Sequence, residues 1–63
     1  MALEDMPAAV VGERLRLARE AAGVTQSDAA DSIGVARTTL VAMEQGQRRV
    51  RMNELQKLAR RYG

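Results

Sequence analysis

Arginine is the residue type in this sequence with the clearest potential for chemistry, and most of the arginines lie in the second half. Residues 37–63 hold seven basic side chains against two acidic ones, whereas residues 1–36 hold three against six. The basic residues of the second half are Arg37, Arg48, Arg49, Arg51, Lys57, Arg60 and Arg61. A guanidinium group binds phosphate oxygens and the O6 and N7 edge of guanine. This asymmetry is typical of a phosphate-binding face, with a solvated charged surface as the alternative.

Other kinds of chemistry lack the residues they need. The 63 residues include no Cys and no His, which removes disulfides, most structural zinc sites and the usual general base. We therefore expect no enzyme activity, no metal site and no cofactor. No apolar run approaches the roughly 20 residues that span a bilayer, and residues 1–10 carry acids but no basic side chain, unlike a signal peptide. We expect a cytoplasmic protein without membrane contact.

A segment of twenty residues, 26–45, supplies a scaffold for such a face. It reads QSDAADSIGVARTTLVAMEQ. Ala30 is small enough for two helices to cross closely, and Gly34 adopts the positive φ of a sharp helix exit without steric penalty. The apolar positions that turn inward are Ala29, Ile33, Val35, Leu40 and Met43. The spacing predicts a helix-turn-helix, with helices over about 26–33 and 37–45, whose second helix lies in the DNA major groove.

Two further helices are expected to flank this motif. The first is capped by Asp5, with Pro7 in its first turn, and runs to about Ala22, although Gly12 would loosen its first turns. The last starts near residue 52 or 53. Their predicted inward faces are Val11, Leu15, Ala18 and Ala22, then Leu55, Leu58, Ala59 and Tyr62. Between them Thr25 is a good helix cap and Ala36 a poor one. The prediction is an all-α, compact four-helix bundle, with residues 1–7 as a flexible arm and residues 8–63 as the DNA-binding domain.

Residues 11–63 resemble the Cro/repressor-type helix-turn-helix family, also called the Xre family. The resemblance rests on GERLRLARE at 12–20, GVTQ at 23–26, the motif itself, MEQGQRR at 43–49 and ELQKLARRYG at 54–63. It implies a lambda-repressor-like bundle of four or five helices that binds double-stranded DNA as a prokaryotic or phage transcriptional regulator, and a repressor in particular. The chain departs from the family at Ala18, Ala29 and Ala36, where Leu, Leu and Ser or Thr are common, and we expect no fifth helix within these 63 residues.

The resemblance also implies which residues meet DNA. The base-reading positions fall on Arg37, Thr38 and Ala42, with Val41 on the same side. Arg37 would pair with guanine, worth about 1–3 kcal/mol of discrimination, and a phosphate contact or a solvated side chain is its alternative. Val41 and Ala42 would touch thymine methyl groups. The expected phosphate contacts are Gln26, Thr39, Gln45, Arg48, Arg49 and Arg51. Arg60 and Arg61 are expected to be solvated surface.

One pair of charges is expected to be structural. Family members often pair an Arg at position 19 with a Glu at position 44, which links the first helix to the end of the third. A charge on the semi-buried side of a helix needs a partner, and removing either residue would leave the charge of the other without one. We expect the Arg19–Glu44 pair to orient the recognition helix.

Two other functions remain open from the sequence. The domain could be a protein-interaction module in an antitoxin-like or regulatory complex. It could also target a larger regulator, since residues 43–63 look like those of members that precede a zinc metallopeptidase domain; no HExxH motif is present, so peptidase activity would lie elsewhere. We expect dimerisation on DNA, or through a region outside this chain, and a monomer when the chain is alone.

Overall fold

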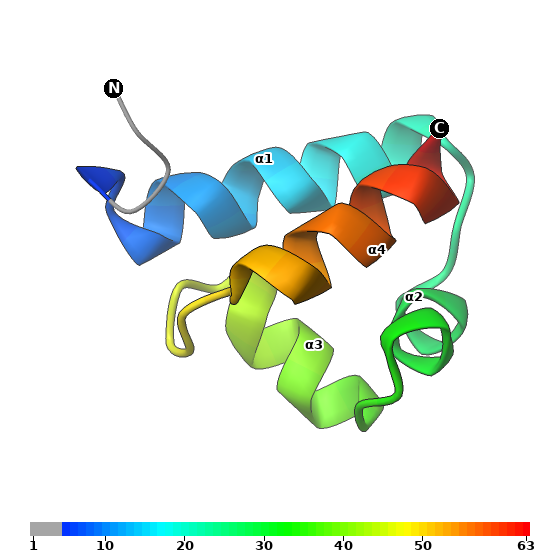
Figure 1. Ribbon diagram of the computed structural model, residues 1–63. Helices are drawn as coiled ribbons and strands as arrows, with labels where there is room; N and C mark the ends of the chain where they lie inside the picture. The colour runs from blue at the N-terminus through cyan, green and yellow to red at the C-terminus, as the bar shows by residue number, and fades with distance from the viewer. Residues whose placement is uncertain (1–4) are drawn as a thin grey trace.

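Four helices enclose one small apolar core in the computed structural model, which describes residues 5–63. They are α1 (Ala8–Ala21), α2 (Gln26–Ile33), α3 (Arg37–Glu44) and α4 (Met52–Tyr62) (Figure 1). The helices α1 and α2 each pack against both α3 and α4. This arrangement confirms the predicted all-α four-helix bundle. Within the described residues, no helix is long and apolar enough to cross a membrane.

The core is built from a few fully buried side chains of moderate size. Leu40, Met43 and Leu58 are the largest of them, and Ala29 and Ala30 are buried beside them. The other buried hydrophobic residues are Val11, Leu15, Val24 and Ile33. Because the two alanines are small, α2 approaches its neighbours closely, as the motif requires of Ala30.

The turn between α2 and α3 has the predicted geometry. Gly34 takes a φ of 72°, and its N–H donates to the Asp31 carbonyl oxygen at 3.2 Å. The Val35 N–H donates to the Ala30 carbonyl oxygen at 3.1 Å, which completes a Schellman motif. At the other end of α2, the Thr25 hydroxyl accepts the Asp28 N–H at 3.1 Å. Both the turn and the cap are therefore confirmed.

Helix α1 departs from the prediction at its start and on its buried face. Pro7, not Asp5, occupies the N-cap position, and no side chain caps the helix. Ala18 and Ala22 are exposed, and the buried stripe instead passes from Leu15 to Arg19. The predicted face was wrong because a charged side chain with a buried partner replaces an apolar one in the stripe.

Helix α4 shows the same kind of departure. Ala59, predicted to face inward, is exposed, whereas Glu54 is buried together with Leu58. Positions 54, 58 and 62 lie one turn apart on the same face. The carboxylate of Glu54 can take an inward position because it has hydrogen-bond donors there, described below. At the start of the chain, residues 1–4 of the predicted flexible arm lie outside the described residues, while Met6 packs against the core.

Gly12 is buried where α1 crosses the end of α3. A Cβ atom built at this position would lie 2.6 Å from the Glu44 carbonyl oxygen and would also collide with the Met43 carbonyl oxygen. Gly46 makes the matching approach from the other side, since a Cβ there would lie 2.6 Å from the Ala9 Cα. Backbone therefore meets backbone at this crossing, and Gly12 is a packing requirement rather than a loose point in the helix.

Substituting Gly12 with Ala should therefore destabilise the fold by about 1–3 kcal/mol, the usual cost of overpacking. Helix propensity alone predicts the opposite sign, a gain of about 1 kcal/mol. Urea denaturation of the Gly12→Ala variant measures the net change in the free energy of unfolding, which combines the overpacking cost and the propensity gain. Ala18→Gly, at an exposed site of the same helix, is the control for propensity. A Gly12→Ala variant as stable as the parent would contradict the close crossing.

Candidate nucleic-acid interface

Helix α3 divides its residues cleanly between the core and the surface. Leu40, Met43 and Glu44 are buried. Every residue predicted to read bases lies on the other side and is exposed or half-exposed: Arg37, Thr38, Val41 and Ala42, which we call the reading face. Gln45 is also exposed, and Thr39 is half-exposed. As predicted, Ala36 gives α3 no side-chain cap.

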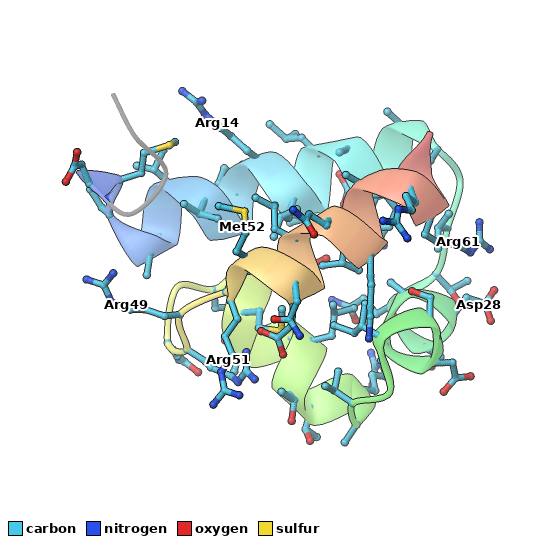
Figure 2. All side chains as sticks on the ribbon, viewed as in Figure 1. Arg14, Asp28, Arg49, Arg51, Met52 and Arg61 are labelled. Carbon is cyan, nitrogen blue, oxygen red and sulfur yellow. The ribbon has the colours of Figure 1, made fainter. Side chains whose placement is uncertain are left out.

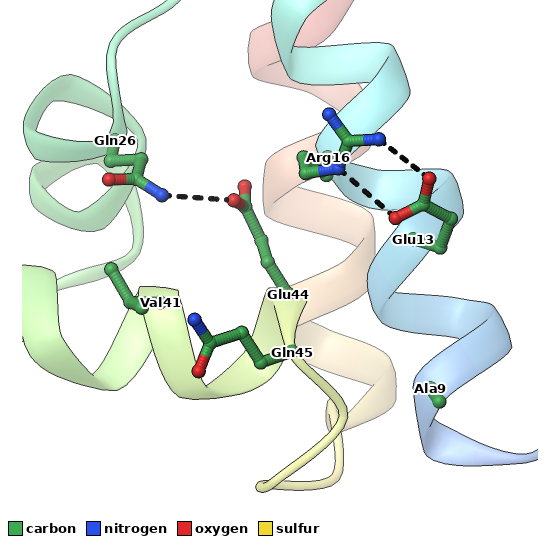
Figure 3. Close-up of a pocket in the computed structure, with 7 residues that line it drawn as sticks. All are labelled: Ala9, Glu13, Arg16, Gln26, Val41, Glu44 and Gln45. Atoms are coloured by element: carbon green, nitrogen blue, oxygen red, sulfur yellow. Dashed lines mark hydrogen bonds and ion pairs between the residues drawn. The ribbon is translucent and has the colours of Figure 1, made fainter.

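A chain of hydrogen bonds connects the reading face to the core. The Arg37 Nη2 donates to the Gln26 Oε1 at 2.9 Å. The other end of the same amide, Gln26 Nε2, donates to the Glu44 Oε1 at 3.2 Å (Figure 3). Gln26 is the first residue of α2, so the start of α2 bridges the start and the end of α3. Arg37 is thus held in place before any ligand is present.

The buried end of this chain is the Arg19–Glu44 ion pair. The Arg19 Nε and Nη2 donate to the Glu44 Oε2 at 2.7 Å and the Glu44 Oε1 at 3.2 Å. The two side chains are only 11% and 3% exposed, and Arg19 Nη1 also donates to the Val24 carbonyl oxygen at 3.0 Å. The hydrogen bonds that Arg19 donates to the Glu44 carboxylate raise the pKa of Arg19 above its ordinary value. The structure therefore contains the predicted pair, and the pair joins α1, α3 and the α1–α2 connection.

The basic loop, residues 47–51, follows α3 and contains a second ion pair. The Arg48 guanidinium donates to both Glu54 carboxylate oxygens, at 2.9 and 2.8 Å. The Glu54 Oε1 also accepts the Arg51 N–H at 2.9 Å, which caps the start of α4. The hydrogen bonds from Arg48, and to a lesser extent the one from the Arg51 N–H, hold the pKa of Glu54 below its ordinary value. Arg48 is thereby engaged within the protein, while Arg49 and Arg51 are exposed (Figure 2).

The role of Glu54 as the partner of Arg48 was not predicted from the sequence. A usable signal was present, because an acidic residue in the first turn of a helix accepts backbone N–H groups and attracts a nearby cation. Arg60 and Arg61 are exposed, as expected, and lie in the last turn of α4, where positive charge is favoured by the helix dipole.

The chain matches a model of a protein family. A protein-family model described as a helix-turn-helix domain matches residues 10–63, which is most of the chain and includes α2, α3, α4 and α1 from its third residue onward. No curated protein matches the chain.

The burial of Arg19 and Glu44 predicts strong coupling between them. Arg19→Ala should lower the free energy of unfolding by about 3–5 kcal/mol, because it leaves a buried carboxylate without its partner. The double variant Arg19→Ala, Glu44→Ala should lose less than the sum of the two single losses. Urea denaturation of the four proteins gives the coupling. The exposed pair Glu13–Arg16 is the control and should show little coupling. Additive losses at positions 19 and 44 would refute the interaction.

The low pKa of Glu54 predicts a pH-dependent contribution to stability. A carboxylate whose pKa is depressed by folding stabilises the fold above its unfolded pKa, and this contribution is lost as the pH falls through the folded pKa. Glu54→Gln should therefore cost about 1–3 kcal/mol at pH 7, and the difference from the parent should shrink between pH 5 and about pH 3.

Denaturation at pH 7, 5 and 3 measures this difference. Asp31→Asn, at an exposed position of α2, should change stability by less than about 0.5 kcal/mol at pH 7. A Glu54→Gln deficit that stays constant down to pH 3 would mean that ionisation of Glu54 contributes nothing.

Proposed function

We propose that this chain, which belongs to the helix-turn-helix domain family, binds double-stranded DNA sequence-specifically, with α3 in the major groove, as a transcriptional regulator. The family match supports DNA as the partner. The observation that carries the finer proposal is the hydrogen-bonded chain from Glu44 through Gln26 to Arg37. It fixes one exposed guanidinium at the start of α3, where a groove-bound helix first meets base edges.

Base reading is assigned to the reading face. Arg37 would pair with the O6 and N7 atoms of guanine, and Thr38 beside it would donate to a base or a phosphate. The half-exposed side chains of Val41 and Ala42 suit contact with thymine methyl groups. Because Gln26 already holds Arg37, less side-chain freedom is lost on binding.

Phosphate binding is assigned to residues that flank the reading face. Gln26 presents the amino end of α2, and Thr39 and Gln45 lie on α3 itself. Arg49 and Arg51 extend from the basic loop, next to Arg48. Arg48 would contribute only the N–H groups that Glu54 leaves free, and its main effect would be to hold the loop in shape. These contacts carry no sequence information but add affinity that falls with salt.

The regulatory role we propose is that of a repressor in the cytoplasm, which acts by occupying its DNA site. Domains that place a recognition helix in the major groove gain affinity when two of them occupy half-sites about one helical turn apart. The large hydrophobic residues exposed in the described part of the chain are Val10, Leu17 and Met52. Three such side chains are few for an interface of about 800 Å² per partner, which favours dimerisation on DNA rather than before it.

Selection from a pool of random duplexes tests the proposal. The expected result is an enriched sequence that contains guanine within the span of one α3 helix. Failure to enrich any duplex at low salt would overturn DNA recognition and favour the protein-interaction module.

Arg37→Ala should then weaken binding to the selected duplex by about 1–3 kcal/mol and relax the preference at one base position. Binding to an unrelated duplex should change much less. Arg49→Ala is the control, because loss of a phosphate contact weakens all sequences alike. Fluorescence anisotropy on matched and mismatched duplexes separates the two effects. Equal losses of Arg37→Ala on both duplexes would show that Arg37 contacts phosphate and reads no base.

A further inference from the structure

A groove of about 390 Å³ runs beside the reading face, between α1 and the α2–α3 pair (Figure 3). Gln26, Val41 and Gln45 line one wall, and Glu13 and Arg16 of α1 line the other. These three residues of the α2–α3 wall are ones that the proposed function already places against DNA. The α1 wall has no assigned role.

The charges in this groove differ in how firmly they are held. Glu44 also lines it, but its carboxylate is only 3% exposed and already accepts hydrogen bonds from Arg19 and Gln26. The Arg16 side chain is 37% exposed, and the carboxylates that it meets, from Glu13 and Glu20, are about half exposed. Arg16 is therefore the cation of this groove that a ligand from solvent can reach.

Arg16 is bound by carboxylates at each of its nitrogen atoms. Its Nη2 and Nε donate to Glu13 at 2.6 and 3.1 Å, and its Nη1 donates to Glu20 at 2.8 Å. These are exposed pairs three and four residues apart on one helix, which are individually weak. A phosphate group offers the same planar fork of acceptor oxygens to a guanidinium. A phosphate brought into the groove can thus replace either carboxylate with little loss.

We propose that Arg16 is a DNA-phosphate contact on α1, which Glu13 and Glu20 hold in the free protein and which the DNA backbone takes from them on binding. The inference rests on the proposed function, because it needs the backbone of a duplex along the groove. It extends the interface from α2, α3 and the basic loop to α1.

The two carboxylates would give this contact a second property. When Arg16 turns to a phosphate, it gives up its hydrogen bonds to Glu13 and Glu20. The loss of these hydrogen bonds lowers the affinity for any duplex, including those without the preferred bases. A larger share of the total binding free energy then comes from the reading face, which favours discrimination between sequences.

The test compares Arg16→Ala with Arg14→Ala on the selected duplex over a range of salt concentrations. Arg14 is the matched control, since it is an exposed arginine of the same helix that points away from α2 and α3 (Figure 2). Arg16→Ala should weaken binding about three- to tenfold and reduce the slope of log affinity against log salt by about 0.9. Arg14→Ala should change the affinity less than about twofold, with the slope unchanged. Circular dichroism verifies that both variants keep the helical content of the parent.

The double variant Glu13→Gln, Glu20→Gln tests whether the two carboxylates compete with DNA phosphate for Arg16. With Arg16 present, this variant should bind about threefold more tightly than the parent, because both competitors for the guanidinium are gone. With Arg16→Ala added, most of that gain should disappear.

Three results would count against the inference, and they are distinguishable. If Arg16→Ala behaves like Arg14→Ala, Arg16 is no phosphate contact. If the gain from the two glutamines is the same with and without Arg16, the carboxylates only repel DNA and do not hold Arg16. If the parent chain binds no duplex at all, the proposed function fails and the assignment of Arg16 fails with it.

Discussion

The buried ion pair between Arg19 and Glu44 is the interaction on which the other parts of this small domain depend. Two full charges are removed from water, which is tolerable only when each finds its partners. The Glu44 carboxylate accepts two hydrogen bonds from Arg19 and one from Gln26, and Arg19 uses its remaining terminal nitrogen on the Val24 carbonyl oxygen. A single arrangement of α1, α2 and α3 satisfies all of these groups together. Such a pair does not need to add net stability to be useful, because a packing that buried one of the two charges without the other would be strongly disfavoured.

The core side chains are few and small, and close contact between the backbones of α1 and α3 adds to the packing. The largest fully buried side chains are two leucines and a methionine, and alanines occupy the tight positions of α2. Gly12 and Gly46 allow α1 to lie directly on the end of α3, with no side chain between the two backbones. The direction of α3 is therefore set at its end by backbone contact and by Glu44, and at its start by Gln26. A helix of eight residues held at both ends can present its exposed side in one orientation.

The parts of the fold that the sequence predicted are those whose cause is local. The cap at Thr25, the turn at Gly34 and the limits of α2 follow from hydrogen bonds and φ values within a few residues. The Arg19–Glu44 pair spans 25 residues, and it was expected from the family resemblance rather than from spacing. Periodicity failed at Ala18 and Ala59, because it treats charged residues as exposed and alanines as buried.

The features that the sequence missed depend on contacts between distant segments. Nothing local distinguishes Gly12 from a weak point in a helix, since its role appears only when α3 lies against it. Arg48 was grouped with Arg49 and Arg51 because the three follow each other in one basic loop. Glu54 binds the side chain of Arg48 and leaves those of Arg49 and Arg51 exposed. This difference depends on α4 turning back toward the loop.

The charge that such a domain can offer to DNA is set by the fold and not by its composition. Arg19 is neutralised in the interior by Glu44, and Arg48 is bound to Glu54. Arg37 is held by a neutral amide, and its full charge stays available at the start of α3. Counting arginines therefore overestimates the number of phosphate contacts, and so the expected dependence of affinity on salt. In the proposed function, the charge of Arg37 would therefore help to fix α3 in the groove, beside the side chains to which base reading is assigned.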